Sequence, residues 1–76
     1  MAYRKYIIRN RDHEAWLMGI GVAGADKVYT YRTNLAEAIV YETLMEARRV
    51  AKACRGRVQV LKMSKGRKAY AEDLKE

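Results

Sequence analysis

The chain of 76 residues has no proline, no phenylalanine, one cysteine and one histidine. A single cysteine, Cys54, excludes an internal disulfide and suits a reducing compartment. His13 has no second histidine to act with, and Cys54 lies far from it in the sequence, so no set of metal ligands is visible. We expect no metal, no cofactor, and a fold stabilised by packing alone.

Long apolar runs are missing as well. The longest, residues 15–25, is interrupted by three glycines and is too short to cross a bilayer. The sequence starts Met1-Ala2-Tyr3-Arg4-Lys5 and passes directly into an alternating pattern, without the apolar core of a signal peptide. We therefore expect no membrane anchor and a cytoplasmic location.

The length bounds the organisation of the chain. Domains this small bury only about 60% of the surface that the unfolded chain exposes, which leaves room for one modest core. No linker or low-complexity segment divides the sequence. The sequence predicts a single domain over residues 1–76, with residues 69–76 left open as a short helix, an extra strand or a frayed tail.

Three strands are predicted in the first half of the chain. Residues 2–10 and 27–32 alternate in polarity and are rich in aromatic and β-branched types, which is typical of strands. Residues 15–20 are continuously apolar, as in a centrally placed strand. The polar segment 10–14 and the glycines after residue 20 favour turns, so we expect an antiparallel meander.

Helix signals follow. Asn34 and Thr43 each precede a glutamate by three residues, the spacing of a helix N-terminal capping box. The first predicted helix is short, and the second covers residues 44–55, with Gly56 as its left-handed C-terminal residue. Residues 57–63 predict a strand after it.

These elements give an α+β fold, a small two-layer sandwich of order β-β-β-(short helix)-α-β. One amphipathic helix is expected to cover one face of an antiparallel sheet. Cys54 falls on the apolar side of that helix, which favours a buried structural thiol over a nucleophile. The residues expected to help form the core are Tyr6, Ile8, Trp16, Val58 and Val60.

A literal G-x-G-x-x-G stands at Gly19, Gly21 and Gly24. Nucleotide binding needs a helix at the third glycine and a βαβ unit around it, whereas a turn and a strand are predicted here. We interpret the motif as a glycine-rich strand end and hairpin loop. The acidic residues are scattered, without a pair placed for acid and base catalysis, so we expect no enzymatic activity.

Positive charge is the strongest functional signal. Sixteen Lys and Arg against nine Asp and Glu give a net charge of +7, which favours polyanionic partners. Residues 47–71 contain no acid. On the predicted helix, Arg48, Arg49, Lys52 and Arg55 form a solvent-facing arc, the basic ridge. The candidate binding residues are Arg48, Arg49, Lys52, Arg55, Arg57, Lys62, Lys65, Arg67 and Lys68.

Two interpretations of these cations stay open. They can hold phosphates through charge and counterion release, with Tyr or Trp on a neighbouring surface stacking unpaired bases. They can equally complement the dipole at the helix C-terminus and keep a small domain soluble.

Residues 31–60 resemble small uncharacterised phage and prophage accessory proteins. The resemblance rests on Asn34-Leu35-Ala36-Glu37-Ala38, Tyr41-Glu42-Thr43-Leu44-Met45-Glu46-Ala47 and Gly56-Arg57-Val58. It implies a setting in which small proteins modify host machinery, repress nucleases or handle nucleic acid. The basic helix departs from the acidic style of inhibitors that mimic DNA.

Two functions are therefore expected as alternatives. The first is a non-enzymatic accessory protein that binds DNA or RNA backbone through the basic ridge and the basic segment 62–68. The second is an inhibitor or adaptor that binds an acidic patch on a host protein, as an anti-CRISPR-like or other anti-defence protein would. Free sheet edges also allow a homodimer.

Overall fold

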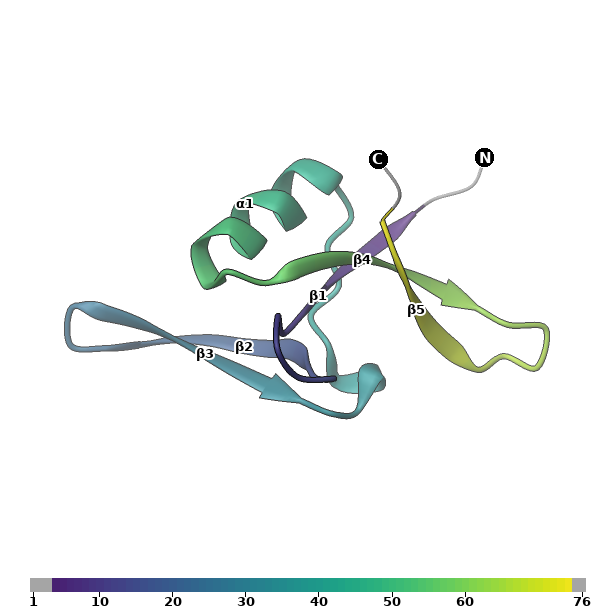
Figure 1. Ribbon diagram of the computed structural model, residues 1–76, viewed down its shortest axis with the longest axis horizontal. Helices are drawn as coiled ribbons and strands as arrows, with labels where there is room; N and C mark the ends of the chain where they lie inside the picture. Colours follow the sequence, from purple (N-terminus) through teal and green to yellow (C-terminus); the bar gives the residue numbers. More distant parts are fainter. Residues whose placement is uncertain (1–3, 75–76) are drawn as a thin grey trace.

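The computed structural model describes residues 4–74 and shows a five-stranded antiparallel sheet with one α-helix (Figure 1). The strands stand side by side in the order β3-β2-β1-β4-β5. Residues 2–3 of the first predicted strand and residues 75–76 of the predicted tail lie outside the described range. The predicted α+β class is confirmed. In chain order the elements are β1 (Lys5–Arg9), β2 (Trp16–Ala23), β3 (Asp26–Arg32), the 3-10 turn η1 (Leu35–Glu37), α1 (Leu44–Cys54), β4 (Arg57–Met63) and β5 (Ala69–Asp73).

The helix α1 packs across one face of β1 and β4. Because side chains alternate along a strand, Tyr6 and Ile8 both point toward the helix. Tyr6 packs with Ala47 and Val60, and Ile8 packs with Ala51 and Leu17. The predicted core is confirmed: Tyr6, Ile8, Trp16 and Val60 are buried and Val58 is partly buried.

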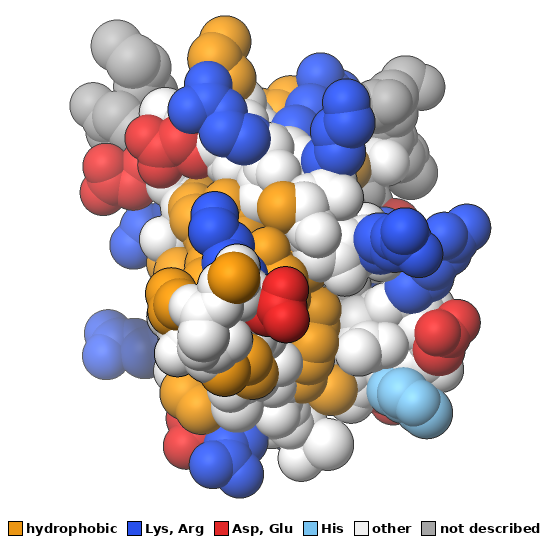
Figure 2. Space-filling view, turned by 90° about the vertical axis from the view of Figure 1, so that its left-hand side faces the viewer, with side chains coloured by type: hydrophobic (Ala, Val, Ile, Leu, Met, Phe, Trp, Pro, Cys, Tyr) orange, Lys and Arg blue, Asp and Glu red, His pale blue; other side chains and the backbone are white. Residues whose placement is uncertain are grey.

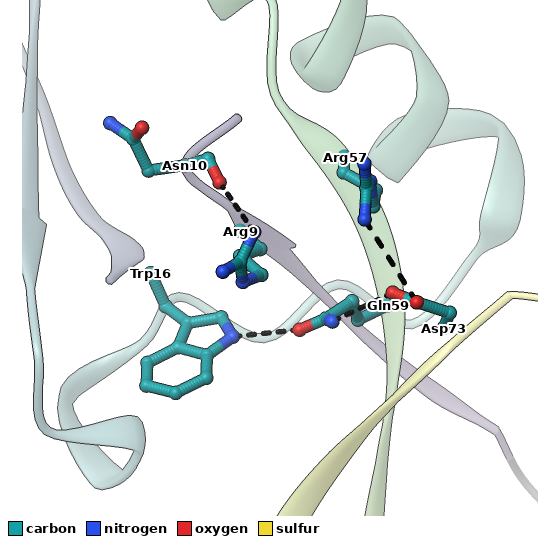
Figure 3. Close-up of polar contacts among 6 residues, drawn as sticks. All are labelled: Arg9, Asn10, Trp16, Arg57, Gln59 and Asp73. Atoms are coloured by element: carbon teal, nitrogen blue, oxygen red, sulfur yellow. Dashed lines mark hydrogen bonds and ion pairs between the residues drawn. The ribbon is translucent and has the colours of Figure 1, made fainter. Parts of the chain in front are cut away.

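The other face of the sheet carries a second, polar centre. Ile7 is fully buried there and lies opposite Gln59 in the β1–β4 register. The indole Nε1 of Trp16 donates a hydrogen bond of 2.8 Å to Gln59 Oε1, and Gln59 Nε2 donates one of 2.9 Å to Asp73 Oδ1 (Figure 3). The three side chains tie β2, β4 and β5 together. Residues 69–73, left open by the sequence, therefore form an edge strand and not a frayed tail.

The β2–β3 hairpin projects from the body of the molecule, which measures 44 Å along its longest axis (Figure 1). Its two-residue loop places Gly24 at a φ of 65° between paired Ala23 and Asp26. Positive φ at the first loop residue is the geometry of a type II′ hairpin turn. Gly19 and Gly21 lie on β2, so the strand-end interpretation of the glycine motif is confirmed. Most of the apolar segment 15–20 lies on β2, which stands inside the sheet between β3 and β1, and the middle strand is β1.

Both predicted N-terminal caps form, since Asn34 accepts a hydrogen bond from the Ala36 N–H and Thr43 accepts one from the Glu46 N–H. The predicted C-terminal cap is wrong by one residue. Arg55, with a φ of 59°, takes the left-handed conformation in place of Gly56.

Gly56 serves a different purpose at this helix end. A Cβ on it would stand 2.6 Å from Ile8 Cγ2 and 2.9 Å from the Arg9 carbonyl oxygen. Glycine is thus needed for the close approach of the chain to β1, and the left-handed turn moves to the preceding arginine.

Candidate nucleic-acid interface

All nine predicted binding residues are exposed, and the structure sorts them by the two ends of β4. The basic ridge lies on α1, and Arg57 begins β4 just after it. Lys65, Arg67 and Lys68, the loop cluster, lie beyond the other end of the strand, where the β4–β5 loop projects on the opposite side of Figure 1. Seven residues of strand span about 20 Å. This distance exceeds the Debye length of about 8 Å at physiological salt, so the two groups act as separate charged surfaces.

Lys52, Arg55 and Arg57 of the first group line an open hollow at the C-terminus of α1, whereas Arg48 and Arg49 lie outside its lining. The hollow measures about 380 Å³, and we call it the helix-end hollow. Its cations come from three segments of the chain: the β1–β2 loop, α1 with its cap, and β4. The residues that line it are Arg11, Ala51, Lys52, Arg55, Gly56 and Arg57.

Arg11 was not among the predicted residues. Its position depends on the β1–β2 loop, where the Asn10 side chain accepts hydrogen bonds from the N–H groups of Asp12 and His13 at 2.9 and 3.2 Å. The Asn10 N–H also bonds the Ala15 carbonyl at 2.7 Å. A side chain that bonds its own loop in this way fixes a tight turn, and the asparagine was the one sequence signal for it.

The electrostatic balance of the helix-end hollow is positive. Among residues 4–74, no acidic residue lines it. Asp73 Oδ2 approaches Arg57 Nη1 at 3.9 Å, but both side chains are more than half exposed, and such pairs are weak. The α1 C-terminus contributes only about half a negative charge. Four cations thus exceed what the helix dipole requires.

A smaller hollow of about 260 Å³ adjoins the first and includes Tyr31, Cys54 and Asp12. Burial, followed by the neighbouring Cys54 thiol, raises the pKa of Tyr31 to about 12. Burial is also the main cause that raises the pKa of Tyr41. Cys54 itself is half-buried, and its thiol contacts the Ala51 carbonyl at 3.8 Å. The thiol therefore lies among neutral hydroxyls, in a packing position.

The loop cluster is held by a compact turn. The Arg67 N–H bonds the Ser64 carbonyl at 2.9 Å, and the Lys68 N–H bonds Ser64 Oγ at 3.2 Å. Arg67 adopts a left-handed φ of 60°. This turn presents Lys65, Arg67 and Lys68 to solvent together. Lys62 lies on β4 and forms an ion pair of 3.1 Å with Glu72.

The aromatic side chains differ in whether a ligand can reach them. Trp16 is only 9% exposed and its indole is bonded to Gln59, so it cannot stack on a base. Among residues 4–74, Tyr70 is the only tyrosine that counts as exposed, at 43%. It lies opposite Lys62 in the β4–β5 register and lines an open hollow of about 570 Å³ with Arg4 and Lys5. The sequence named neither Tyr70 nor this hollow.

Figure 2 shows the end of the molecule that carries the projecting hairpin. Lys and Arg side chains gather along the top and at one side, while an apolar band occupies the middle. Exposed Ile20, Val22 and Val28 belong to the hairpin strands. Charged side chains also stand within this apolar band, so positive charge and apolar surface are neighbours at this end of the molecule.

Comparison with protein-family models, with curated proteins and with solved structures finds no match for this chain. Across residues 4–74, no helix has the length and apolar character needed to cross a bilayer.

Proposed function

We propose that this protein is a non-enzymatic accessory protein, of the phage or mobile-element kind, that binds the sugar–phosphate backbone of nucleic acid. The observation that supports this most is the helix-end hollow. Three segments of the chain bring Arg11, Lys52, Arg55 and Arg57 around one open space, and no acidic side chain of the described range 4–74 lines it. Guanidinium groups bind phosphate through paired, charge-assisted hydrogen bonds.

The loop cluster extends this contact. It lies about 20 Å from the helix-end hollow along β4, which equals about six phosphates of one strand at 3.4 Å each. One nucleic-acid strand can therefore reach both surfaces. Such contacts release counterions and position the ligand without reading its sequence.

Tyr70 adds a preference within this proposal. Its exposed ring stands beside Lys62, Arg4 and Lys5, and a base stacked on an aromatic ring contributes about 1–3 kcal/mol. Stacking requires an unpaired base. We therefore expect single-stranded oligonucleotides to bind more tightly than duplexes, and Tyr70→Ala to remove that difference.

The test is a salt titration of binding, in which the fluorescence anisotropy of labelled single- and double-stranded oligonucleotides measures the affinity at each salt concentration. For duplex DNA the logarithm of affinity should fall with the logarithm of salt by about 0.9 per phosphate contacted. The double variant Arg11→Gln/Lys52→Gln should lower that slope by about two. Lys27→Gln is the matched control, because Lys27 is exposed on the projecting hairpin. Absence of binding to any DNA or RNA at low salt would contradict the proposal.

A protein partner is the second candidate. Met45 is 72% exposed on α1, the helix that carries the basic ridge, and exposed methionine suits an adaptable contact surface. In this case the cations would face an acidic patch on a host protein. A pull-down before and after nuclease treatment separates the candidates: a partner that survives digestion favours protein, and loss of every partner favours nucleic acid.

A further inference from the structure

We propose that two copies of this chain pair along the free edge of β3 and form a twofold-symmetric dimer. This inference does not depend on the proposed function. β3 is an end strand of the sheet and pairs only with β2 among the described elements. It is seven residues long, and the chain contains no proline to interrupt it. The unpaired backbone groups of a free edge are a template for another strand.

Backbone geometry restricts how such a pair can form. The β2–β3 turn makes Ala23 and Asp26 a hydrogen-bonded pair, and hydrogen-bonded pairs then alternate along the ladder. Asp26, Val28 and Thr30 thus direct their backbone groups toward β2. Lys27, Tyr29 and Tyr31 direct theirs outward, and in a dimer each must lie opposite a residue of this same outward set.

The register centred on Tyr29 meets this condition and is the one that pairs all seven residues of both strands. It places Asp26 opposite Arg32 of the partner subunit, and symmetry creates that ion pair twice. Lys27 then faces Tyr31 of the partner subunit, a cation beside an aromatic ring. Opposite charges directly across a strand pair are favourable and like charges are not. No like-charged pair arises in this register.

The allowed registers on either side are poorer. A shift by two residues in one direction places Val28 against itself and Asp26 opposite Thr30 of the partner subunit. The opposite shift places Val28 opposite Arg32 of the partner subunit. Either shift removes both ion pairs and leaves part of each strand unpaired.

The other edge of the sheet lacks this complementarity. β5 has five residues, and its two acidic side chains already have partners within the chain: Glu72 with Lys62 and Asp73 with Gln59. Pairing of β5 with itself around Ala71 would set Asp73 opposite Ala69. The charges of the chain therefore select β3 as the dimer edge.

The dimer joins two five-stranded sheets into one. The twofold axis that relates the two antiparallel β3 strands is perpendicular to the plane of the sheet, so both α1 helices lie on the same face of the joined sheet. The net charge of +7 on each chain opposes association, but at physiological salt this repulsion is screened beyond about 8 Å. The two exposed hairpins are the parts that meet, and exposed Val28 packs beside Thr30 of the partner subunit.

The first test is light scattering over a range of concentrations at physiological salt, with charge reversals at β3. Asp26→Arg or Arg32→Asp alone sets like charges opposite each other twice and should weaken the dimer by about tenfold or more. The double variant Asp26→Arg/Arg32→Asp restores opposite charges and should restore the dimer. A monomer at every concentration, or a dimer that ignores the single reversals, would overturn the proposal. Circular dichroism confirms that each variant is folded.

The second test reads the register by disulfide capture in a Cys54→Ser background. Val28 and Thr30 are both exposed, so a cysteine at either position leaves the core intact. In the Tyr29-centred register, position 28 of one chain faces position 30 of the other at a Cα separation of about 4.5 Å, within disulfide reach. A mixture of Val28→Cys and Thr30→Cys should form the mixed disulfide. Predominant self-linking of either variant, or no linking, would contradict this register.

Discussion

The two ends of β4 carry nearly the same tripeptide, Arg55-Gly56-Arg57 at the helix end and Lys65-Gly66-Arg67 in the loop cluster. In both, an arginine takes the left-handed conformation next to the glycine. Their surroundings differ. Gly56 lies against Ile8 and the Arg9 backbone, whereas a Cβ on Gly66 would meet nothing within 4 Å. Similar local sequence thus makes a packed junction in one place and an open turn in the other.

The largest expected effect is on stability, when the glycine of each tripeptide is replaced by alanine. Gly56→Ala pushes a methyl group into a fully buried isoleucine and a backbone carbonyl, and overpacking of this kind lowers the free energy of unfolding by about 1–3 kcal/mol. Gly66→Ala should change it by less than about 1 kcal/mol, because the space is open and no positive φ is required. Urea unfolding followed by circular dichroism measures both. Equal losses at the two sites would contradict the packing argument.

A smaller effect concerns the two left-handed arginines. Arg55→Gly and Arg67→Gly each relieve a conformation that is unfavourable for side chains by about 1–2 kcal/mol, offset in part by the added freedom of glycine in the unfolded chain. We expect each variant to be stabilised by up to about 1 kcal/mol while the salt slope of nucleic-acid binding falls by about one. The free energy of unfolding would then rise while the affinity for nucleic acid falls. Weaker binding together with lower stability would indicate a damaged fold instead.

The smallest expected effect is a pH dependence of stability that comes from Tyr31, which lines the hollow next to the helix-end hollow. Burial raises the pKa of Tyr31 to about 12, above the value near 10 of an unfolded chain. Below pH 10 the Tyr31 hydroxyl keeps its proton in both the folded and the unfolded chain, so its full contribution to the free energy of unfolding is present. Between pH 10 and 12 the unfolded chain loses its proton first, so stability falls as pH rises. Tyr31→Phe should flatten this alkaline decline in unfolding experiments, with Tyr70→Phe as the exposed control; an unchanged pH profile would contradict it.

Local signals in the sequence predicted most of the fold. Asn34 and Thr43 marked helix starts because capping depends on atoms within three residues. The alternation of residues 27–32 predicted β3, whose Tyr29 and Tyr31 are partly buried while their neighbours are exposed. The central strand β1, in contrast, is buried on both faces. In the site, the exposure of the basic ridge followed from helical spacing alone.

The parts that the sequence did not predict depend on distant residues. β5 has a weak strand composition, and it is fixed by the hydrogen bond from Gln59 to Asp73. Arg11 joins the helix-end hollow from a loop far along the chain. Gly56 was assigned the left-handed turn because glycine favours it, but contact with Ile8 uses that glycine for packing. Each case needs a neighbour that sequence periodicity does not reveal.

The polar centre on the face of the sheet opposite α1 contains an intrinsic fluorescent probe. Trp16 is the single tryptophan of the chain, and its indole bonds Gln59 on β4 and, through it, is linked to Asp73 on β5. Its fluorescence is therefore a built-in optical signal for the joining of β2 to the C-terminal hairpin. That signal should respond to unfolding and also to ligand binding at the helix-end hollow, because Arg57, which lines that hollow, approaches Asp73 at 3.9 Å.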